Sequence, residues 1–177
     1  MFAILKKEFK SYFLSPIGYV VIGIFLLVFS VFFYLTAISS VTVDLGALYY
    51  YTALYGLIII APILTMRMFA EERKSGTEQL ILTSPVSMVG VVFGKFLAAM
   101  CVILLTLLIS FMYFFIVKFF GEPNISAVLV HMLGFILVSA AAISIGMFAS
   151  SITENQIIAG IITIAFLVMT LFIQDLN

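Results

Sequence analysis

The sequence predicts an all-α fold, a polytopic membrane helix bundle with a cytoplasmic N-terminus. Of its 177 residues, 65% are hydrophobic and 9% are charged, whereas a soluble domain carries roughly 25% charged residues. The hydrophobic residues form runs of about 20, the length that an α-helix needs to cross the hydrocarbon core. The Lys and Arg residues fall almost entirely on one side of such spans, and that side is normally the cytoplasm.

Residues 1–15 are expected to form an interfacial amphipathic helix on the cytoplasmic leaflet. Apolar and aromatic residues recur there at three- and four-residue steps, and three lysines (Lys6, Lys7 and Lys10) fall mainly on the other side, which is typical of a helix lying in the membrane surface. A basic flank without fixed structure is the alternative for so short a segment. Ser15-Pro16 then turns the chain into the first span.

Residues 16–177 are expected to form a transmembrane domain of five spans. The second span contains Pro62, for which a tolerated kink is the simpler interpretation and a bend that transmits motion the other. The third is bracketed by Lys95 and Lys118, whose side chains we expect to snorkel to opposite headgroup regions, with residues 88–94 in the cytoplasmic interface. The predicted spans are about 17–38, 48–66, 96–117, 127–149 and 157–173.

The distribution of basic residues predicts the topology. With the N-terminus inside, seven of the eight Lys and Arg residues are cytoplasmic and only Lys118 is outside. The inverted orientation would reverse this count, against the rule that basic residues stay in the cytoplasm. Residues 67–87 are then cytoplasmic, and the last residue lies outside. The seven cytoplasmic basic residues are Lys6, Lys7, Lys10, Arg67, Arg73, Lys74 and Lys95.

The composition argues against several classes of function. The predicted spans contain no Asp or Glu, which proton-driven carriers and intramembrane hydrolases usually need. His131 is the only histidine and has no neighbours at metal-ligand spacing, and a net charge of +0 offers nucleic acid no electrostatic footprint. Lys74-Ser75-Gly76-Thr77 reverses the order of a phosphate-binding loop. We therefore expect no catalytic residue and no cofactor, with any energy supplied by another subunit.

Residues 67–87 are the one long polar interruption of the chain, and we expect them to be a cytoplasmic coupling segment. Residues 66–74 can extend the second span as a charged helix that Gly76 ends or bends. Ser75 and Glu78 have the spacing of a capping box, which predicts a short helix over about 76–83.

Such a helix, held at the membrane by two spans, suits insertion into a groove of a partner. The alternative is a solvated loop that only joins two spans, because charged runs are often no more than that. The candidate docking residues are Glu71, Glu72, Arg73, Gly76, Thr77, Glu78, Leu80, Ile81 and Pro85.

Small residues at four-residue spacing indicate where helices pack closely. Ala142, Gly146 and Ser150 form such a ridge on the fourth span, and Gly90 and Gly94 form a second pair near the cytoplasmic edge. Ridges of this kind let helix backbones approach each other in lipid. Each pattern alone is weak evidence, because it is frequent by chance.

Four separated motifs resemble the ABC-2 type permeases, the membrane subunits of a large class of ATP-driven transporters. MFAEERKSGTEQLILTSPVS, residues 68–87, resembles the family signature. KKEFKSYFLSPIGY at 6–19, Gly94-Lys95, and IGMFASSITENQIIA at 145–159 are similar to the gliding-motility-associated branch. The resemblance covers essentially the whole chain. The signature positions matched are Phe69, Glu71, Glu72, Arg73, Gly76, Thr77, Leu80, Pro85, Val86 and Ser87.

The resemblance implies a permease subunit of an exporter in the inner (plasma) membrane, with an elbow helix and a coupling helix between spans 2 and 3. It implies a homodimer or heterodimer with a second permease, and ATPase subunits that bind the ATP. It also implies six spans. Since five are found here, we expect a truncated chain or a last part that this sequence does not include. The alternative function is a membrane anchor or assembly component of a secretion or motility complex without its own transport path.

Overall fold

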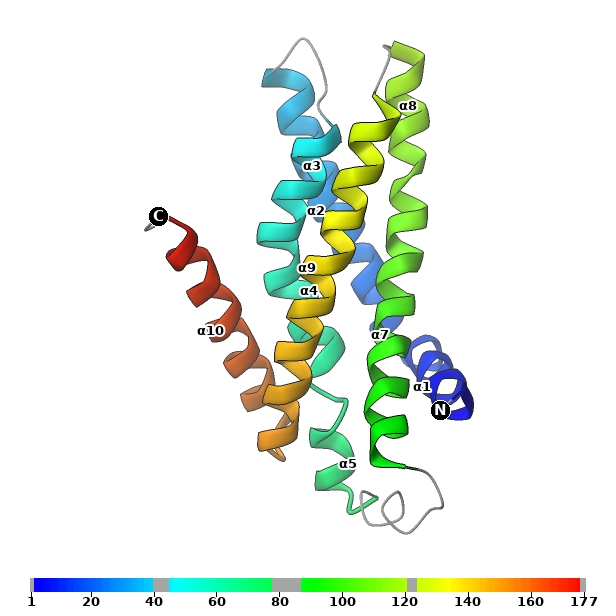
Figure 1. The fold of residues 1–177 in the computed structure, drawn as a ribbon, viewed down its shortest axis with the longest axis vertical. Coiled ribbons are helices and arrows are strands. Elements are labelled where there is room, and N and C mark those ends of the chain that lie inside the picture. The colour runs from blue at the N-terminus through cyan, green and yellow to red at the C-terminus, as the bar shows by residue number, and fades with distance from the viewer. Residues whose placement is uncertain (1, 40–44, 78–86, 121–123, 176–177) are drawn as a thin grey trace.

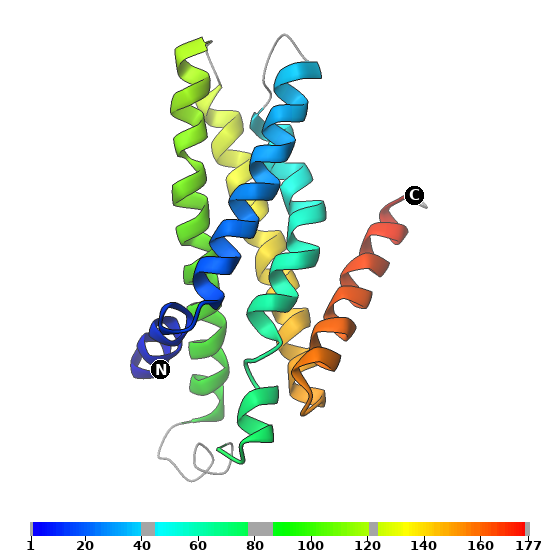
Figure 2. The same ribbon diagram turned by 180° about the vertical axis from the view of Figure 1, so that it is seen from behind.

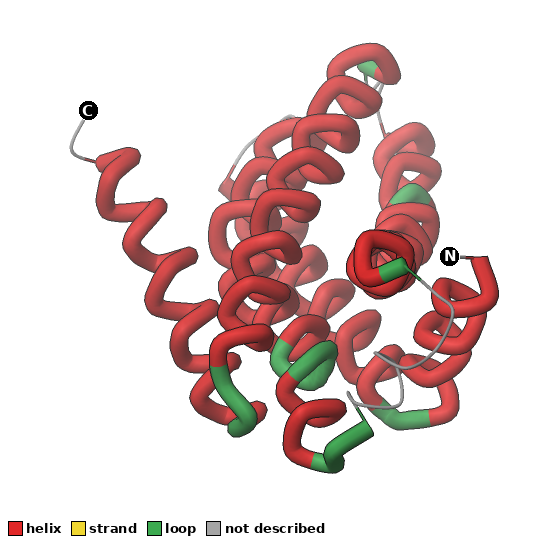
Figure 3. Tube along the Cα trace, turned by 60° about the horizontal axis from the view of Figure 1, so that its bottom comes forward, coloured by secondary structure: helices red, strands yellow, loops and turns green. Residues whose placement is uncertain are grey.

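The computed structural model describes residues 2–39, 45–77, 87–120 and 124–175. Within these ranges the chain forms helices and short turns and no strand (Figures 1 and 3), so the expected all-helical class is confirmed for them. The elements are α1 (Phe2–Leu14), α2 (Ile17–Ser39), α3 (Leu45–Tyr51), the π-helix η1 (Thr52–Gly56), α4 (Leu57–Thr65), α5 (Ala70–Lys74), α7 (Met88–Ser110), α8 (Met112–Phe120), α9 (Ile125–Ile152) and α10 (Gln156–Asp175).

Four helical stretches of the described chain are long and apolar enough to cross a membrane, namely Ile17–Thr36, Leu45–Lys74, Met88–Phe119 and Ile125–Ile152. They run side by side along the long axis of the molecule (Figures 1 and 2), so the chain is a multi-pass membrane bundle. The fifth expected span corresponds to α10, whose apolar part, Gln156–Phe172, is shorter. α10 packs on α9 and α4 and leans away from the bundle towards its C-terminal end (Figure 1).

An aromatic cluster joins four of the membrane elements. The ring of Phe29 on α2 lies 5.1 Å from that of Tyr49 on α3 and 5.0 Å from that of Tyr113 on α8, centroid to centroid. Phe25, one turn away, meets Phe135 of α9 edge-on at 5.6 Å. Because lipid tails are as apolar as these side chains, close packing rather than the hydrophobic effect holds such helices together.

α1 lies across the bundle and packs against α7 and α2 (Figure 2). Ser15 and Pro16 form the turn into α2, and proline suits the first turn of a helix. A Cβ on Gly18 would lie 2.8 Å from the carbonyl oxygen of Tyr12, so glycine is needed where α2 begins this close to α1. α1 falls within the expected elbow helix, while its position in a membrane interface stays a prediction.

The second membrane stretch does not continue as one charged helix. α4 runs through Pro62, which has no N–H to donate to the carbonyl one turn earlier. After Thr65 the chain forms a turn over residues 66–69 and only then starts α5. A turn and a separate short helix therefore replace the continuous helix expected over 66–74. Side chains from α7 and α9 bind the backbone groups of this turn, as described below.

The third membrane stretch begins earlier than expected. α7 is continuous from Met88, where the Oγ of Ser87 accepts a hydrogen bond of 3.2 Å from the N–H of Gly90. This is a standard N-cap, in which a side-chain oxygen satisfies a free amide of the first turn. Residues 88–94 thus belong to the same helix as the first part of the predicted span over 96–117, the rest of which lies in α8 after a turn at Phe111. Lys95 consequently lies well inside a helix and not at its end.

Candidate functional site

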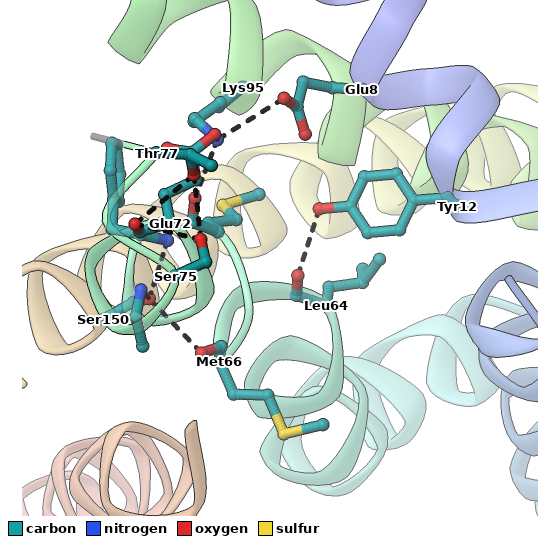
Figure 4. A network of polar contacts seen from close by, with 12 residues as sticks. Glu8, Tyr12, Leu64, Met66, Glu72, Ser75, Thr77, Lys95 and Ser150 are labelled. Atoms are coloured by element: carbon teal, nitrogen blue, oxygen red, sulfur yellow. Dashed lines mark hydrogen bonds and ion pairs between the residues drawn. The ribbon is translucent and has the colours of Figure 1, made fainter. Parts of the chain in front are cut away.

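The start of α5 is fixed by a serine of α9. The Oγ of Ser150 accepts hydrogen bonds of 3.1 Å from the N–H groups of both Phe69 and Ala70, and it lies 3.4 Å from the carbonyl oxygen of Met66, to which it donates (Figure 4). The first N–H groups of a helix have no partner within the helix. The hydroxyl of Ser150 supplies the missing hydrogen-bond acceptor from another helix, and this attaches the charged segment to α9.

The end of α5 is defined by Gly76, whose φ of +70° is a left-handed conformation that favours glycine. The N–H of Ser75 donates to the carbonyl of Glu71 at 3.0 Å, and the N–H of Gly76 donates to that of Arg73 at 3.2 Å. The hydroxyls of Ser75 and Thr77 lie 2.9 Å apart. As the sequence indicates, the charged helix ends at this glycine.

The other predicted docking residues, Glu78, Leu80, Ile81 and Pro85, lie outside the described residues. The same holds for the short helix expected over 76–83 and for the capping box that includes Glu78. These features stay predictions. The described part of the coupling segment is residues 67–77 and Ser87.

A buried lysine connects three elements beside α5. The side chain of Lys95 is 2% exposed, and its Nζ lies 2.7 Å from the carbonyl oxygen of Met68 and 2.7 Å from the Oε1 of Glu72. The Oε1 of Glu8 on α1 is 3.4 Å away. The ring centroid of Phe69 lies 5.3 Å from the same Nζ, within cation–π range. The expectation that Lys95 snorkels to the headgroups is therefore wrong, because this polar cluster inside the protein holds the ammonium.

The three charged candidates on α5 have different surroundings. Glu72 points inwards to Lys95, and its side chain is 18% exposed. Glu71 is half exposed and pairs with Arg67 one turn earlier. The Nη2 of Arg67 donates to Oε1 at 3.5 Å, and its Nε lies 3.0 Å from Oε2 outside hydrogen-bond geometry. Arg73 lines a groove that residues of α7 and α9 also line. Glu71 and Arg73 are thus better placed than Glu72 to meet a partner.

Tyr12 fastens α1 to the end of α4. Its hydroxyl donates a hydrogen bond of 3.0 Å to the carbonyl of Leu64 (Figure 4). In a longer helix the N–H of Met68 would bond that carbonyl, but it donates to Thr65 instead, at 3.0 Å. Burial, and secondarily the charge of Glu8, raise the pKa of Tyr12 above its ordinary value, so the hydroxyl keeps its proton and stays a donor.

The small residues of α9 face α4 and α5. Ala142 is buried in a cluster with Ala61 and Leu167, and Ser150 caps α5. A Cβ on Gly146 would lie 2.7 Å from the Cβ of Thr65, so the two helix backbones approach as closely as a glycine allows.

The second small pair lies on α7, where Gly94 is buried and Gly90 half-buried. Gly90 lies in the first turn of the helix and donates its N–H to Ser87. Gly94 directly precedes the buried Lys95.

A groove of about 550 Å³ opens beside α5, between the start of α7 and the end of α9. Its walls are mostly apolar, with the guanidinium of Arg73 among them. Such a surface suits an amphipathic ligand or partner better than a small polar one. The described residues contain no group of three or more His, Cys, Asp and Glu placed to hold a metal. Other lining residues include Phe69, Met88, Phe93, Met147 and Phe148.

Sequence reasoning overlooked the roles of Lys95, Glu8 and Tyr12. A signal for Lys95 was present, because a lysine inside an apolar helix needs a carboxylate or carbonyl partner. Glu8 is the only acidic residue before Asp44, which marks it as a candidate. Which of Glu8, Glu71 and Glu72 pairs with Lys95 could not be decided without the fold.

The comparisons with known proteins agree with this architecture. Residues 2–176 match the family described as ABC-2 family transporter protein. No curated protein and no solved structure matches the chain. Since the family match covers almost every residue, including all the helices described above, the chain belongs to the ABC-2 transporter family and is one of its membrane components.

Proposed function

We propose that this chain is the permease subunit of an ABC-2 exporter in the inner (plasma) membrane, where it couples ATP hydrolysis by a partner subunit to translocation of a substrate. The observation that carries the proposal is the attachment of α5. This short charged helix follows a membrane stretch directly and is bound by Ser150 of α9 and Lys95 of α7. A push on α5 would therefore reach two other membrane helices at once.

The proposed topology places the N-terminus and residues 67–87 in the cytoplasm. The 7-to-1 division of Lys and Arg in the sequence supports it. In this arrangement α10 is a fifth span, supported by its apolar composition and its packing on α9 and α4. α1 then lies at the cytoplasmic surface as the elbow helix.

Within the coupling segment, we propose that the exposed face of α5 and the residues after it contact the ATPase. Glu71 and Thr77 are exposed, and Gly76 directs the chain out of the helix. Glu72 and Arg73 belong to the same element, and Glu78, Leu80, Ile81 and Pro85 follow it in sequence. The ATPase binds the ATP, and the permease, as a homodimer or heterodimer, contributes no catalytic residue. A place in the gliding-motility branch rests on the sequence motifs alone.

The test is capture of the ATPase from native membranes by the tagged chain. The chain with residues 67–87 intact should bring down an ATPase, and the same chain with these residues scrambled should not. Scrambling Thr153-Glu154-Asn155, the short connection between α9 and α10 in which Glu154 and Asn155 are exposed, is the matched control and should leave capture unchanged. Capture that survives scrambling of 67–87 would reject the coupling role. Absence of any captured ATPase would favour a membrane anchor.

A further inference from the structure

Lys95 has two kinds of partner, and they lie on different elements of the chain. Its two short contacts, both 2.7 Å, are to the carbonyl of Met68 and to Glu72. Its longer contact, 3.4 Å, is to Glu8. Met68 and Glu72 lie on the turn and helix of the coupling segment, whereas Glu8 lies on α1 (Figure 4). One ammonium is thus shared unequally between two carboxylates on different elements.

The coupling segment is the less firmly held of the two elements. α5 has only five residues, and its start is held by hydrogen bonds to the Ser150 hydroxyl. α1 has thirteen residues, packs along α7, and is fastened to α4 by Tyr12. A displacement of α5 away from α7 would therefore leave Glu8 where it is. It would remove Glu72 from Lys95, and if the preceding turn moved as well, it would also remove the carbonyl of Met68.

Lys95 cannot be left without a partner after such a displacement. Its side chain is 2% exposed, and a buried charge that loses its counter-ion is strongly destabilising. Lys95 lies inside the continuous helix α7, so its backbone cannot follow α5. Its side chain has a flexible four-carbon stem, and its ammonium has three N–H donors that can be reoriented towards a new acceptor. The carboxylate of Glu8, already within ion-pair distance, is the partner that remains.

We propose that Lys95 passes from Glu72 to Glu8 when the ATPase displaces the coupling segment, and that Glu8 is the positioning residue that stabilises the displaced state. This inference rests on the proposed function, since the ATPase supplies the displacement. The exchange also links α5 to α1, because the ion pair with Glu8 of the elbow helix, 3.4 Å long in the resting state, shortens when the coupling segment loses its own pair with Lys95. Neither residue is catalytic.

The proposal predicts opposite effects for two removals of charge. Glu8→Gln removes a long contact of 3.4 Å from the resting state and the main partner of Lys95 from the displaced state, so it weakens the displaced state more, whereas Glu72→Gln weakens the resting state. The ratio of displaced to resting molecules should fall about tenfold in the first variant and rise about tenfold in the second. Glu8→Asp should stay close to wild type because it keeps the charge. A general loss of stability would move both variants in the same direction.

The experiment measures the separation of α1 and α5 by spin labels in the full chain bound to its ATPase in vesicles. Labels at Lys10→Cys and Lys74→Cys, both exposed positions, are introduced with the native Cys101 replaced by Ala. The distance distribution is recorded without nucleotide and with a non-hydrolysable ATP analogue. The analogue should increase the longer-distance population, and the Gln variants should shift that population in opposite directions.

A second pair of variants tests whether the effect passes through Lys95. In a Lys95→Met background the ammonium is absent, so adding Glu8→Gln should change the ratio by less than about twofold. An equal effect of Glu8→Gln with and without Lys95, or shifts of the same sign for Glu8→Gln and Glu72→Gln, would overturn the exchange alone, provided that the ATPase is bound. If the ATPase does not co-purify with the labelled chain, the proposed function fails and the exchange with it.

Discussion

The aromatic cluster and the polar network around Lys95 hold different parts of the bundle together, the first α2, α3, α8 and α9 and the second α7, α1 and the coupling segment. Phe25, Phe29 and Phe135 are fully or almost fully buried, and each ring packs closely against other rings of the cluster. Lys95 instead has two carboxylates within reach, at 2.7 and 3.4 Å. A close-packed contact has one good arrangement, whereas an ion pair with a spare partner has two. The comparison teaches that the rigid part of this bundle is apolar and that the part able to rearrange is its charged end.

The largest loss of stability should come from removing a ring at the centre of the aromatic cluster. Phe29→Ala removes a ring that touches Tyr49 and Tyr113 and should lower the free energy of unfolding by about 3–5 kcal/mol. The matched control is Phe119→Ala, because Phe119 is 87% exposed and should cost little. Denaturant titration in detergent measures both. Equal losses would mean that the cluster is not the rigid part.

The glycine contact between α9 and α4 should be next in size. Gly146→Ala places a Cβ against Thr65, so the helices must separate, which costs about 1–3 kcal/mol. Gly134→Ala, on the same helix with nothing within 4 Å of the added Cβ, should be neutral or slightly stabilising, because alanine favours helices. A neutral Gly146→Ala in the same titration would show that this crossing is looser than described.

Removing the cap of α5 should loosen the charged end without disturbing the aromatic cluster. Ser150→Ala deprives the amides of Phe69 and Ala70 of their acceptor, a loss of about 1 kcal/mol. Hydrogen exchange at these two amides should become several-fold faster. Ser151→Ala is the control, since the Ser151 hydroxyl bonds only within its own helix, to Phe148. Unchanged exchange at both amides would contradict the role given to Ser150.

The smallest effect is a pH dependence carried by Tyr12. Tyr12→Phe removes the bond to Leu64 and should cost about 1 kcal/mol at neutral pH. The pKa of Tyr12 is raised in the folded chain, so its contribution is complete below the unfolded value of about 10 and decreases as pH rises above it. The difference in stability between wild type and Tyr12→Phe should therefore shrink above about pH 10. Tyr19→Phe, exposed at 64%, is the control. A difference that grows above that pH would reverse the sign assigned here.

The sequence predicts the parts of this fold that depend on composition and periodicity. The helical class follows from run length, and the end of α5 follows from Gly76. The parts that depend on distant residues were not accessible. Lys95 is buried against Glu8 and Glu72, 87 and 23 residues away in the chain, and backbone groups of the turn over 66–69 bind Ser150 and Lys95. A pattern read along one helix cannot show which other helix supplies its partners.

The central claim is that residues 67–87 face the cytoplasm, where an ATPase can reach them. It is tested most directly by labelling intact cells with a membrane-impermeant maleimide, in a chain whose native Cys101 is replaced by Ala. Single cysteines are placed at Lys74 and Lys118, both exposed. The account predicts labelling of position 118 in intact cells and of position 74 only after lysis. Labelling of position 74 in intact cells, with position 118 protected, would contradict it.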